Sequence, residues 1–312
     1  MLPINLYSII IHPKTKAIFK KIINDKIVFN DGNELPIYKN IPILLSNDSI
    51  FNSTDVIANK VTTQDSNFRN KNNFKNYIRT KIIPSLSQDF KIDKRYFNLN
   101  LLLKENSTIL ILGAGDKIDY YKNIFNKSTV ITSDVHTQFE IDVVLDGHEI
   151  PFKDEVFDLV LAAQVIEHTL KPWIFAEEIF RVTKTNGYIQ IEAPQNYPYH
   201  GQPYDFFRFT FTGLRTMFSK CKLYNTAITE GNASTIAISN ANFIVNASSN
   251  KYYRQIALFT TRFMFGWMKY LDNLKLTQRT VSSPKGFAMT FLKDNKERNS
   301  EELFEEFYKL PK

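Results

Sequence analysis

The sequence predicts an α/β protein built on an open, mostly parallel sheet. Five short apolar segments recur between residues 108 and 194, and polar or helix-forming residues separate them. The apolar residues run continuously instead of alternating with polar ones, as in strands that are buried on both faces. Directly after the first segment, a Gly-Ala-Gly turn allows the backbone to approach a ligand closely. In such a sheet, ligands bind at the carboxyl ends of the strands.

Before these segments, the chain divides into two stretches of different character. Residues 1–50 read as short β segments, namely LYSIIIH, AIFKKII, KIVFN and ELPIYKNIPILL, and the pair Asp31-Gly32 between two of them is a hairpin signal. Residues 51–100 are rich in Asn, Lys, Asp and Ser and contain weak helical patches such as FKNYIRTKIIPSL. We expect a small β module followed by a partly helical connector.

The expected strands of the sheet are TILIL (108–112), STVITSD (128–134), IDVVLD (141–146), FDLVLAA (157–163) and GYIQIEAP (187–194). Only about seven residues join the second to the third, whereas a parallel crossover usually needs a dozen or more. The helix of this connection is therefore expected to be missing or a single turn, and the third strand to be short.

The segment KPWIFAEEIFRVTKTNG reads as a helix that begins near Pro172 and ends before Gly187. Its apolar residues recur at Ile174, Phe175, Ile179 and Val182. A last strand, GFAMTFLK, is expected beside CKLYNTAITE, where it closes the sheet.

Composition restricts the class of protein. A single cysteine, Cys221, excludes a disulfide framework and any Cys-based zinc site, and it fits a reducing compartment. The sequence shows neither signal-peptide features nor a run of about 18 apolar residues, so we expect a cytoplasmic protein. The formal net charge is +7, and residues 251–285 hold seven basic residues against one acid. This segment is either a solvated basic face or a surface that contacts anions.

Residues downstream of the glycine turn indicate the ligand. A pyridine-dinucleotide fingerprint needs a third glycine at position 118, which is Ile118. The stretch from Asp146 to Pro194 has the order Asp, Ile-Pro-Phe, Phe-Asp, Glu-His, Glu, Arg-Val, Gly, Pro, and it resembles class I S-adenosylmethionine-dependent methyltransferases of the type 11-like subgroup. The resemblance covers residues 101–230. It implies a Rossmann-like methyltransferase sheet, mostly parallel with an antiparallel last strand, and S-adenosylmethionine as cofactor with S-adenosylhomocysteine as product.

The resemblance also implies roles for residues at the strand ends. Gly113 and Gly115 would let the backbone approach the methionine moiety, and Asp134 would bind the ribose hydroxyls. Asp146 would accept a hydrogen bond from the adenine amine, and Gln164 would face the methionine amino group or the sulfonium. The full set of expected cofactor contacts is Gly113, Ala114, Gly115, Asp134, Val135, Asp146, Gly147 and Gln164.

Two positions depart from the family pattern. Ile111 stands where the family usually has an acid, and Lys117 replaces the third glycine of the loop. Loss of the acid removes one partner of the methionine ammonium. Asp158, in the Phe-Asp pair that opens a strand, is expected to cap or turn the chain and not to bind a ligand.

The segment HGQPYDFFRFT follows the fifth strand, where the methyl acceptor lies in this fold. It resembles a narrower group of bacterial methyltransferases with a His-x-x-Pro-x-Asp-Phe-x-Arg-Phe-Thr signature, which often accompany glycan-assembly genes. The catalytic candidates are His200, Asp205, Arg208 and His168. A sugar hydroxyl is a poor nucleophile and needs a base, for which His200 is best placed. Arg208 would pair with Asp205 or with an anionic acceptor group, and the alternative is that these residues only brace the loop.

The N-terminal piece resembles a zinc-ribbon-like module fused ahead of methyltransferases, but HPKTK stands where Cys-Pro-x-Cys would be. We expect a metal-free remnant and no metal site elsewhere. The expected organisation is a β module at 1–50, a connector at 51–100, the cofactor-binding core at 101–230, a helical insertion at 231–283, and the last strand with a C-terminal helix at 284–312. The insertion is expected to pack in the core, with an interfacial helix as the alternative.

These residues together predict O-methylation of a sugar or glycan intermediate. One alternative is a quinone, lipid or polyketide-like acceptor, and another is a scaffold that binds S-adenosylmethionine with little turnover. No Asn/Asp-Pro-Pro-Tyr/Phe motif is present, so we expect no nucleic-acid partner. Residues 251–285 are a candidate surface for an acidic membrane or a polyprenyl-pyrophosphate glycan, and the oligomeric state stays open.

Overall fold

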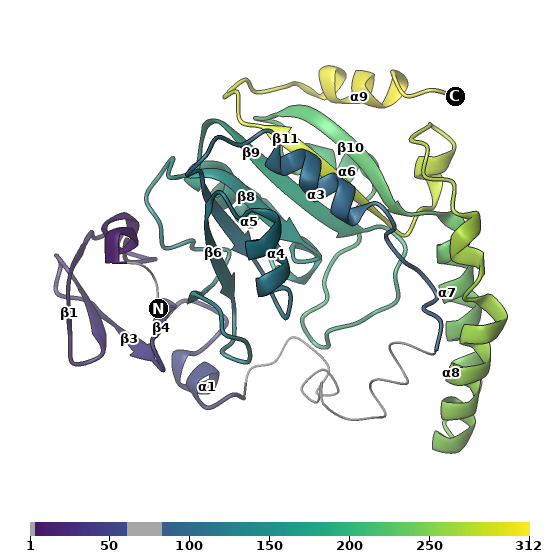
Figure 1. The fold of residues 1–312 in the computed structure, drawn as a ribbon, viewed down its shortest axis with the longest axis horizontal. Coiled ribbons are helices and arrows are strands. Elements are labelled where there is room, and N and C mark those ends of the chain that lie inside the picture. Colours follow the sequence, from purple (N-terminus) through teal and green to yellow (C-terminus); the bar gives the residue numbers. More distant parts are fainter. Residues whose placement is uncertain (1–3, 61–82) are drawn as a thin grey trace.

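The computed structural model describes residues 4–60 and 83–312, and its strands form one sheet (Figure 1). The order across the described sheet is β1-β2-β3-β4-β7-β6-β5-β8-β9-β11-β10. The strands are β1 (Phe19–Ile23), β2 (Lys26–Phe29), β3 (Glu34–Tyr38), β4 (Ile41–Leu44), β5 (Thr108–Leu112), β6 (Thr129–Asp134), β7 (Val143–Leu145), β8 (Phe157–Ala163), β9 (Thr183–Pro194), β10 (Lys222–Glu230) and β11 (Gly286–Leu292).

The helices, with η denoting 3-10 helices, accompany the strands as an α/β fold requires. They are η1 (Ile4–Ile9), α1 (Ser53–Ile57), α3 (Ile92–Asn100), α4 (Ile118–Ile124), η3 (Ile166–His168), α5 (Pro172–Val182), α6 (Phe211–Met217), α7 (Asn232–Val245), α8 (Lys251–Phe265), η4 (Met268–Leu271), η5 (Thr280–Ser282) and α9 (Ser300–Tyr308).

The centre of the sheet is parallel and contains one change of direction in strand order. From β5 the chain moves to β6 and β7 on one side, and it returns to β8 and β9 on the other. The switch point therefore lies between β5 and β8, where open α/β sheets bind ligands. β11 runs antiparallel between β9 and β10. This arrangement confirms the predicted fold class, including its antiparallel last strand.

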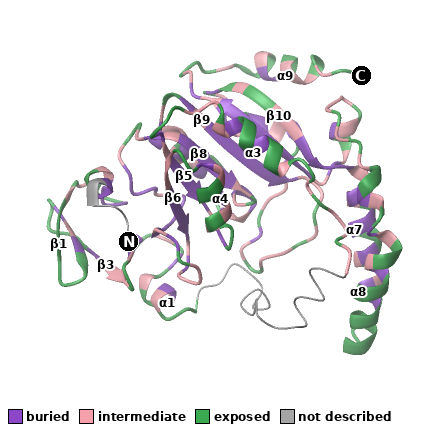
Figure 2. Ribbon diagram, viewed as in Figure 1, coloured by how far each residue is buried: buried purple, intermediate pink, exposed green. Residues whose placement is uncertain are grey.

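Both faces of the parallel strands are buried, which explains their continuous apolar runs. In β5, Ile109 and Ile111 belong to the cluster packed beneath α3 and α4, whereas Leu110 and Leu112 belong to the cluster beneath α5 and α6. The strands are correspondingly the most buried part of the ribbon (Figure 2). Because successive side chains of a strand point to opposite faces, every residue of the run must be apolar.

The boundaries of α5 and β9 differ from the prediction. The helix ends at Val182, and β9 begins at Thr183, which pairs with Phe157. Gly187 is thus inside the strand instead of following the helix. A Cβ at Gly187 would lie 2.9 Å from the Lys184 carbonyl oxygen, so close backbone packing beside a register shift explains this glycine. As predicted, β7 is short, and none of the residues between β6 and β7, all of them described, is helical.

The first apolar run, LYSIIIH, is not a strand. It forms η1 and two isolated bridge residues, and its buried side chains Leu6, Tyr7 and Ile10 have helical spacing. The Asp31-Gly32 hairpin is confirmed between β2 and β3, with Gly32 at φ +86°. His12 is buried, and its Nδ1 accepts a hydrogen bond from the Thr15 N–H.

The N-terminal strands extend the main sheet instead of forming a sheet of their own. β4 pairs in parallel with β7, with Ile43 opposite Val144 and Leu44 opposite Leu145. Residues 61–82, which include most of the helical patch FKNYIRTKIIPSL, lie outside the described part of the chain. The N-terminal edge of the sheet and the helices α7 and α8 lie on opposite sides of the parallel core (Figure 1).

Within the helical insertion, α8 does not pack in the core, contrary to expectation, whereas Val281 near the end of the insertion belongs to the main core cluster. α8 contacts α7, but Ala257 and Thr261 are its only buried residues, and most of its surface is exposed (Figure 2). Tyr252 is 75% exposed and Ile256 is 65% exposed. Within the described residues, no helix has the length and apolarity to cross a membrane.

Candidate functional site

A cavity lies at the carboxyl ends of β5, β6, β7 and β8, next to the switch point. Its wall includes Leu112, Gly113, Asp134, Val135, Asp146, Gly147, Gln164, Val165 and His168. Six of the eight residues expected to contact the cofactor are in this wall, and Ala114 and Gly115 are not. The sheet therefore brings together residues that the sequence separates by 56 positions, such as Leu112 and His168.

The glycine turn after β5 needs its glycines for backbone reasons. Gly113 has φ +64°, and a Cβ there would lie 2.5 Å from Cγ2 of Val165. Gly115 has φ +55°, and its N–H donates to Asp134 Oδ2 over 3.1 Å. Lys117, at φ −96°, adopts a conformation open to any residue, so the missing third glycine leaves the turn intact. Ile111 is fully buried beneath α3 and α4.

Asp134, at the end of β6, holds the turn as well as lining the cavity. The side chain is 8% exposed, and Oδ1 accepts from the Val135 N–H over 2.7 Å. Oδ2 accepts from Gly115, while the Ala114 N–H donates to the Ser133 carbonyl. Carboxylate oxygens accept more than one hydrogen bond, so Asp134 retains acceptor capacity toward the cavity.

Asp146, at the end of β7, is held by three donors. Oδ1 accepts from the His148 N–H over 3.0 Å and lies 2.7 Å from His148 Nδ1, and Oδ2 accepts from the Ser49 hydroxyl over 2.7 Å. Burial alone would raise the pKa of the Asp146 carboxyl, but these hydrogen bonds outweigh burial and keep the pKa below its ordinary value. Next to it, a Cβ at Gly147 would lie 2.4 Å from the Phe175 ring, so glycine keeps this wall thin.

No sequence pattern assigns residues of the N-terminal region to the cavity. Ser49 binds Asp146, and Phe51 forms part of the wall. Both reach the cavity because β4 pairs with β7 and delivers the following residues to the strand ends. Gln164, expected near the sulfonium, has φ +58° at the end of β8 and presents an exposed side chain in the same cavity.

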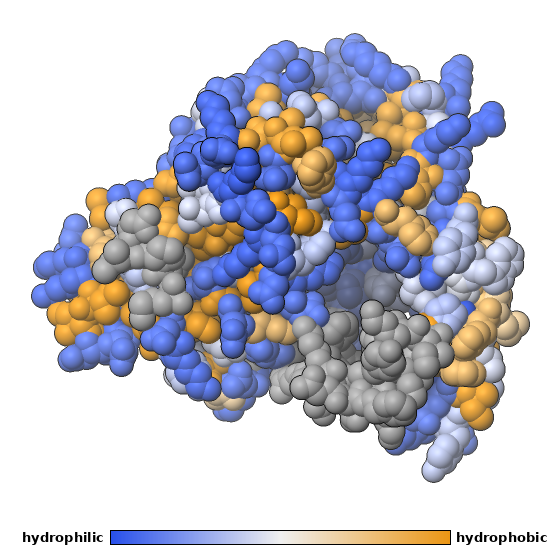
Figure 3. Space-filling model, viewed as in Figure 1, coloured by the Kyte–Doolittle hydropathy of each residue, from blue (hydrophilic) through white to orange (hydrophobic). Residues whose placement is uncertain are grey.

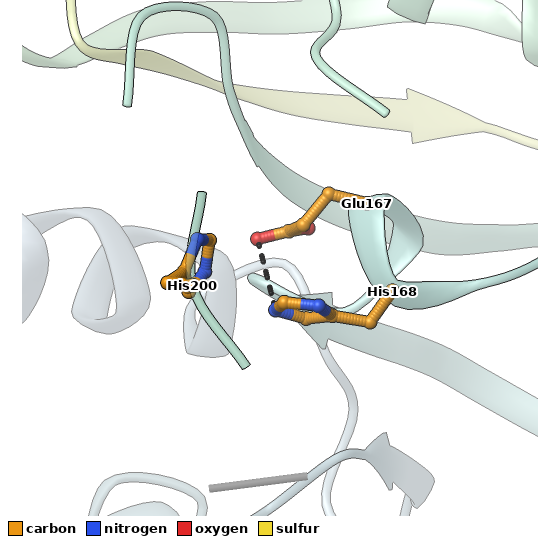
Figure 4. Close-up of side chains that lie close together, drawn as sticks. All are labelled: Glu167, His168 and His200. Carbon is orange, nitrogen blue, oxygen red and sulfur yellow. Dashed lines mark ion pairs between the residues drawn. The ribbon is translucent and has the colours of Figure 1, made fainter. Parts of the chain in front are cut away.

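Two of the four catalytic candidates meet at the edge of this cavity. η3 follows β8 and carries Glu167 and His168, and the loop after β9 carries His200 (Figure 4). The rings of His168 and His200 lie 4.7 Å apart between centroids, nearly perpendicular at 76°. His168 lines the cofactor cavity, whereas His200 lines a second cavity of about 380 Å³ between the 197–200 loop, α7 and α8. The two rings therefore bridge the two cavities.

The other two candidates, Asp205 and Arg208, brace the loop. The buried Asp205 carboxylate accepts from the His200 N–H over 2.7 Å and from both terminal nitrogens of Arg208 over 2.6 and 2.8 Å. Arg208 also donates to the carbonyls of Tyr197, Pro198 and Phe207. Every guanidinium nitrogen thus has a protein acceptor, which favours the bracing alternative over contact with an anionic substrate.

Glu167 is the least satisfied group of the site. Its side chain is fully buried, and neither carboxylate oxygen has a hydrogen-bond partner in the described part of the chain. Burial raises the pKa of Glu167 to about 8. Burial also lowers the pKa values of His168 and His200, which keeps both rings neutral near pH 7. In the sequence the Glu-His pair is only one part of the family pattern, and no signal there indicates that the Glu167 carboxyl is buried without a hydrogen-bond partner.

Asp158 has the structural role expected of it. Its Oδ2 accepts from the Thr108 N–H over 2.8 Å and from Lys184 Nζ over 2.9 Å, at the start of β8 and away from the strand ends that form the cavity.

A comparison with protein families identifies this region. Residues 118–191 match the family described as "Methyltransferase domain". The chain carries a methyltransferase domain. With the strand order and the cavity described above, the protein is an S-adenosylmethionine-dependent methyltransferase, and its cofactor is S-adenosylmethionine. The narrower His-x-x-Pro signature and the N-terminal region lie outside the matched residues.

Solved structures with a similar fold are remote in sequence. A putative methyltransferase from Bacillus halodurans is 15% identical, with 65% of this chain and 99% of that chain covered and a TM-score of 0.40. Phosphoethanolamine N-methyltransferase 2 from Haemonchus contortus, in complex with S-adenosyl-L-methionine, is 13% identical, with 75% and 60% covered and a TM-score of 0.45. No curated protein sequence gives a match.

Proposed function

We propose that the protein transfers the cofactor's methyl group to a hydroxyl of a sugar or glycan intermediate. The observation that supports this acceptor class is the pair of neutral imidazoles that joins the cofactor cavity to the second cavity. The second cavity has polar walls at Ser87 and Asn242 beside apolar ones at Ile238 and Val245. A mixed wall of this kind suits a sugar, whose hydroxyls alternate with C–H faces.

The chemistry of the step requires alignment and removal of one proton. The acceptor oxygen attacks the sulfonium methyl carbon, the C–O bond forms as the S–C bond breaks, and S-adenosylhomocysteine leaves. His200 Nδ1 lies 3.1 Å from the Pro198 carbonyl oxygen, which only accepts, so Nδ1 carries the hydrogen and Nε2 keeps its lone pair. That nitrogen is the proposed proton acceptor. Asp205 positions the ring by binding the His200 N–H.

A screen with methyl-labelled S-adenosylmethionine tests the acceptor. Purified protein is incubated with nucleotide sugars, free glycans and lipid-linked glycans, and in parallel with quinones, other lipids and polyketide-like phenols. Label on a glycan hydroxyl supports the proposal, and label only on one of the other classes replaces it. Intact binding of S-adenosylhomocysteine without transfer to any acceptor would favour the scaffold alternative.

We further propose that the protein works in the cytoplasm and contacts an anionic membrane surface through α8. Tyr252, Ile256, Phe259 and Phe263 recur along one exposed stripe of this helix. Hydrophobic side chains are visible over α8 at the right-hand edge of the molecule (Figure 3). This composition is typical of an interfacial helix.

Only some of the basic residues in 251–285 are available for contact with a membrane. Lys269 is buried and donates to the carbonyl and hydroxyl of Ser85, and Lys285 pairs with Glu230. Lys251 and Arg254, by contrast, are exposed on α8 itself. Near an anionic bilayer each such residue contributes about 1 kcal/mol. The electrostatic part of membrane binding is therefore assigned to Lys251 and Arg254.

Liposome co-sedimentation tests this surface. Binding is expected to require acidic lipid, to fall at high salt and to weaken when Lys251 and Arg254 are both changed to Glu. Changing Lys20 and Lys21 to Glu removes the same charge from β1 and serves as the matched control. Wild-type protein that stays in the supernatant with acidic liposomes at low salt would contradict the membrane proposal.

A further inference from the structure

We propose that Glu167, His168 and His200 bind a divalent transition-metal cation at the junction of the two cavities. The sequence analysis expects no metal site, and Glu167 and His200 are 33 residues apart and belong to different motifs. The inference rests on the proposed function and deepens it, because a bound metal would take over from His200 Nε2 the activation of the acceptor hydroxyl. Metal binding is nevertheless measurable without turnover. The two proposals therefore fail separately.

The three side chains converge on one point (Figure 4). One ligand atom from each lies within 4.8 Å of the other two, and no other group of three such residues occurs in 4–60 and 83–312. Metal–nitrogen and metal–oxygen bonds of about 2.0–2.2 Å place neighbouring ligand atoms roughly 3–3.5 Å apart. Side-chain rotations that close the triad by about 1 Å would complete this geometry.

The carboxylate provides the independent reason to expect a ligand. Glu167 is fully buried, yet both of its oxygens lack a hydrogen-bond partner among the described residues. The nearest basic groups are engaged elsewhere, because Arg208 donates to Asp205 and to backbone carbonyls and Lys285 pairs with Glu230. A buried carboxyl group without a hydrogen-bond partner is costly in either protonation state, and ionised ones in protein interiors are paired with a cation or coordinate a metal. A cation between Glu167 and the two rings would satisfy it.

Both histidines are oriented as metal ligands usually are. His168 Nδ1 donates to the Tyr204 carbonyl and His200 Nδ1 to the Pro198 carbonyl. Metal-binding histidines typically donate one ring N–H to a carbonyl or carboxylate, which fixes the tautomer and leaves the other nitrogen for the metal. His168 Nε2 lies 3.9 Å from Glu167 Oε1, so the nitrogen left free is the one that faces the carboxylate.

The donor set indicates the class of metal. Two imidazoles and one carboxylate suit zinc, iron, cobalt or nickel, whereas magnesium and calcium prefer oxygen ligands alone. Three protein ligands leave at least one coordination position open. A metal here would lie between His168 in the cofactor cavity and His200 in the second cavity, where an acceptor hydroxyl approaches the methyl group. A coordinated hydroxyl loses its proton more easily, and because His200 Nε2 is then a metal ligand, the proton passes to solvent instead of to this nitrogen.

Calorimetry on chelator-treated full-length protein tests the site with Zn²⁺ as the probe, and the absorption spectrum of added Co²⁺ gives the coordination. One equivalent of Zn²⁺ is expected to bind, and Glu167→Gln, His168→Ala and His200→Ala are each expected to weaken binding at least tenfold. The control is His12→Asn in the N-terminal region, which keeps wild-type Zn²⁺ affinity. Mg²⁺ is expected to bind at least a hundredfold more weakly.

Binding of S-adenosylhomocysteine reports whether each variant is folded. A variant that binds S-adenosylhomocysteine but has lost Zn²⁺ supports the site, and if Glu167→Gln does not fold, His200→Ala in the surface loop decides. Absence of stoichiometric Zn²⁺ binding to the wild type, or wild-type affinity in the folded variants, overturns the proposal. Tighter binding of Mg²⁺ than of Zn²⁺ overturns the metal class. Zn²⁺ binding without glycan methylation would leave the metal site standing and remove the proposed acceptor.

Discussion

The two cavities are built in different ways. The cofactor cavity is walled by the ends of parallel strands, and its acidic groups, Asp134 and Asp146, are already held by hydrogen bonds from neighbouring residues. The second cavity is walled by a loop and by helices inserted between strands, and the carboxylate beside it, Glu167, has no partner in the described chain. One site is preorganised by the sheet, and the other depends on segments that the sheet does not constrain.

Because of this difference, we expect cofactor affinity and turnover of the acceptor to depend on different residues. Polar groups that are fixed before the ligand arrives bind it without reorganisation. A buried group that lacks a partner, in contrast, favours any ligand that supplies one. Substitutions at the strand ends should therefore change cofactor affinity, whereas substitutions at the junction should change turnover with little effect on the cofactor.

The largest effect is expected at His200. His200→Ala removes the proposed proton acceptor, and turnover should fall by about 10²–10⁴-fold while affinity for S-adenosylhomocysteine stays nearly constant. Methyl transfer to the acceptor found in the screen and calorimetry with S-adenosylhomocysteine measure the two quantities. Because burial lowers the pKa of His200 below the ordinary 6.5, the acid limb of kcat/KM should lie below pH 6.5. Wild-type turnover in the variant would return His200 to a bracing role.

Asp134 should behave in the opposite way. Asp134→Ala leaves the ribose hydroxyls poorly paired and removes the acceptor for the Gly115 N–H, at a cost of about 1–3 kcal/mol. We expect at least a tenfold loss of S-adenosylhomocysteine affinity in calorimetry. Unchanged affinity would contradict the assignment of this strand end to the cofactor.

Asp146, in the wall of the cofactor cavity, should make the stability of the protein depend on pH. Its pKa is lowered in the folded protein, so its stabilising contribution is present above the unfolded value of 3.8 and is lost as the pH falls through the folded value. Asp146→Asn should lower the free energy of unfolding by about 1.5–3 kcal/mol at pH 7. Denaturant titrations from pH 7 to pH 3 should show the gap between the two proteins closing below pH 3.8. A gap that is constant with pH would mean that the carboxylate charge is not what the donors stabilise.

A substitution at Ser49, in the N-terminal region, should have the smallest effect on stability and on cofactor affinity. Ser49→Ala removes one donor to Asp146, which corresponds to about 1 kcal/mol. The melting temperature should fall by a few degrees, and S-adenosylhomocysteine affinity should fall less than in Asp134→Ala. Ser53→Ala, at the start of α1, is the control for a serine-to-alanine change in the same region. An effect of Ser49→Ala no larger than that of Ser53→Ala would show that the contact to Asp146 contributes nothing measurable.

Features that depend on neighbouring residues were predictable from the sequence, and features that depend on distant segments were not. The parallel strands and their burial on both faces follow from local apolar runs, and the glycine turn places Gly113 at a strand end. The contact from Ser49 to Asp146 spans 97 residues and follows only from the pairing of β4 with β7. Burial of Glu167 likewise depends on the later loop, since its carbonyl accepts from the N–H groups of Phe206 and Phe207. Local patterns predict elements, whereas these groups are defined by contacts between distant segments.

The boundary between α5 and β9 and the exposure of α8 are two further features that could not be predicted from the sequence. Thr183 continues directly from helix to strand without a turn residue, so no residue in the sequence marks the change. In α8 the apolar residues satisfy a helical pattern that is equally compatible with burial and with exposure. Their exposure depends on which distant segments pack over that helix, and a pattern within the helix does not contain this information.

The pairing of β4 with β7 has a consequence for how the chain folds. Ile43 is synthesised about a hundred residues before its partner Val144, so the strand must wait for β7 to leave the ribosome before the sheet edge closes. Such long-range pairings slow folding, because the intervening chain must be ordered first. Until then, β4 exposes unpaired backbone groups of the kind that recruit other chains. Completion of the cofactor cavity, which needs Phe51 from the same region, is therefore a late event in the maturation of this enzyme.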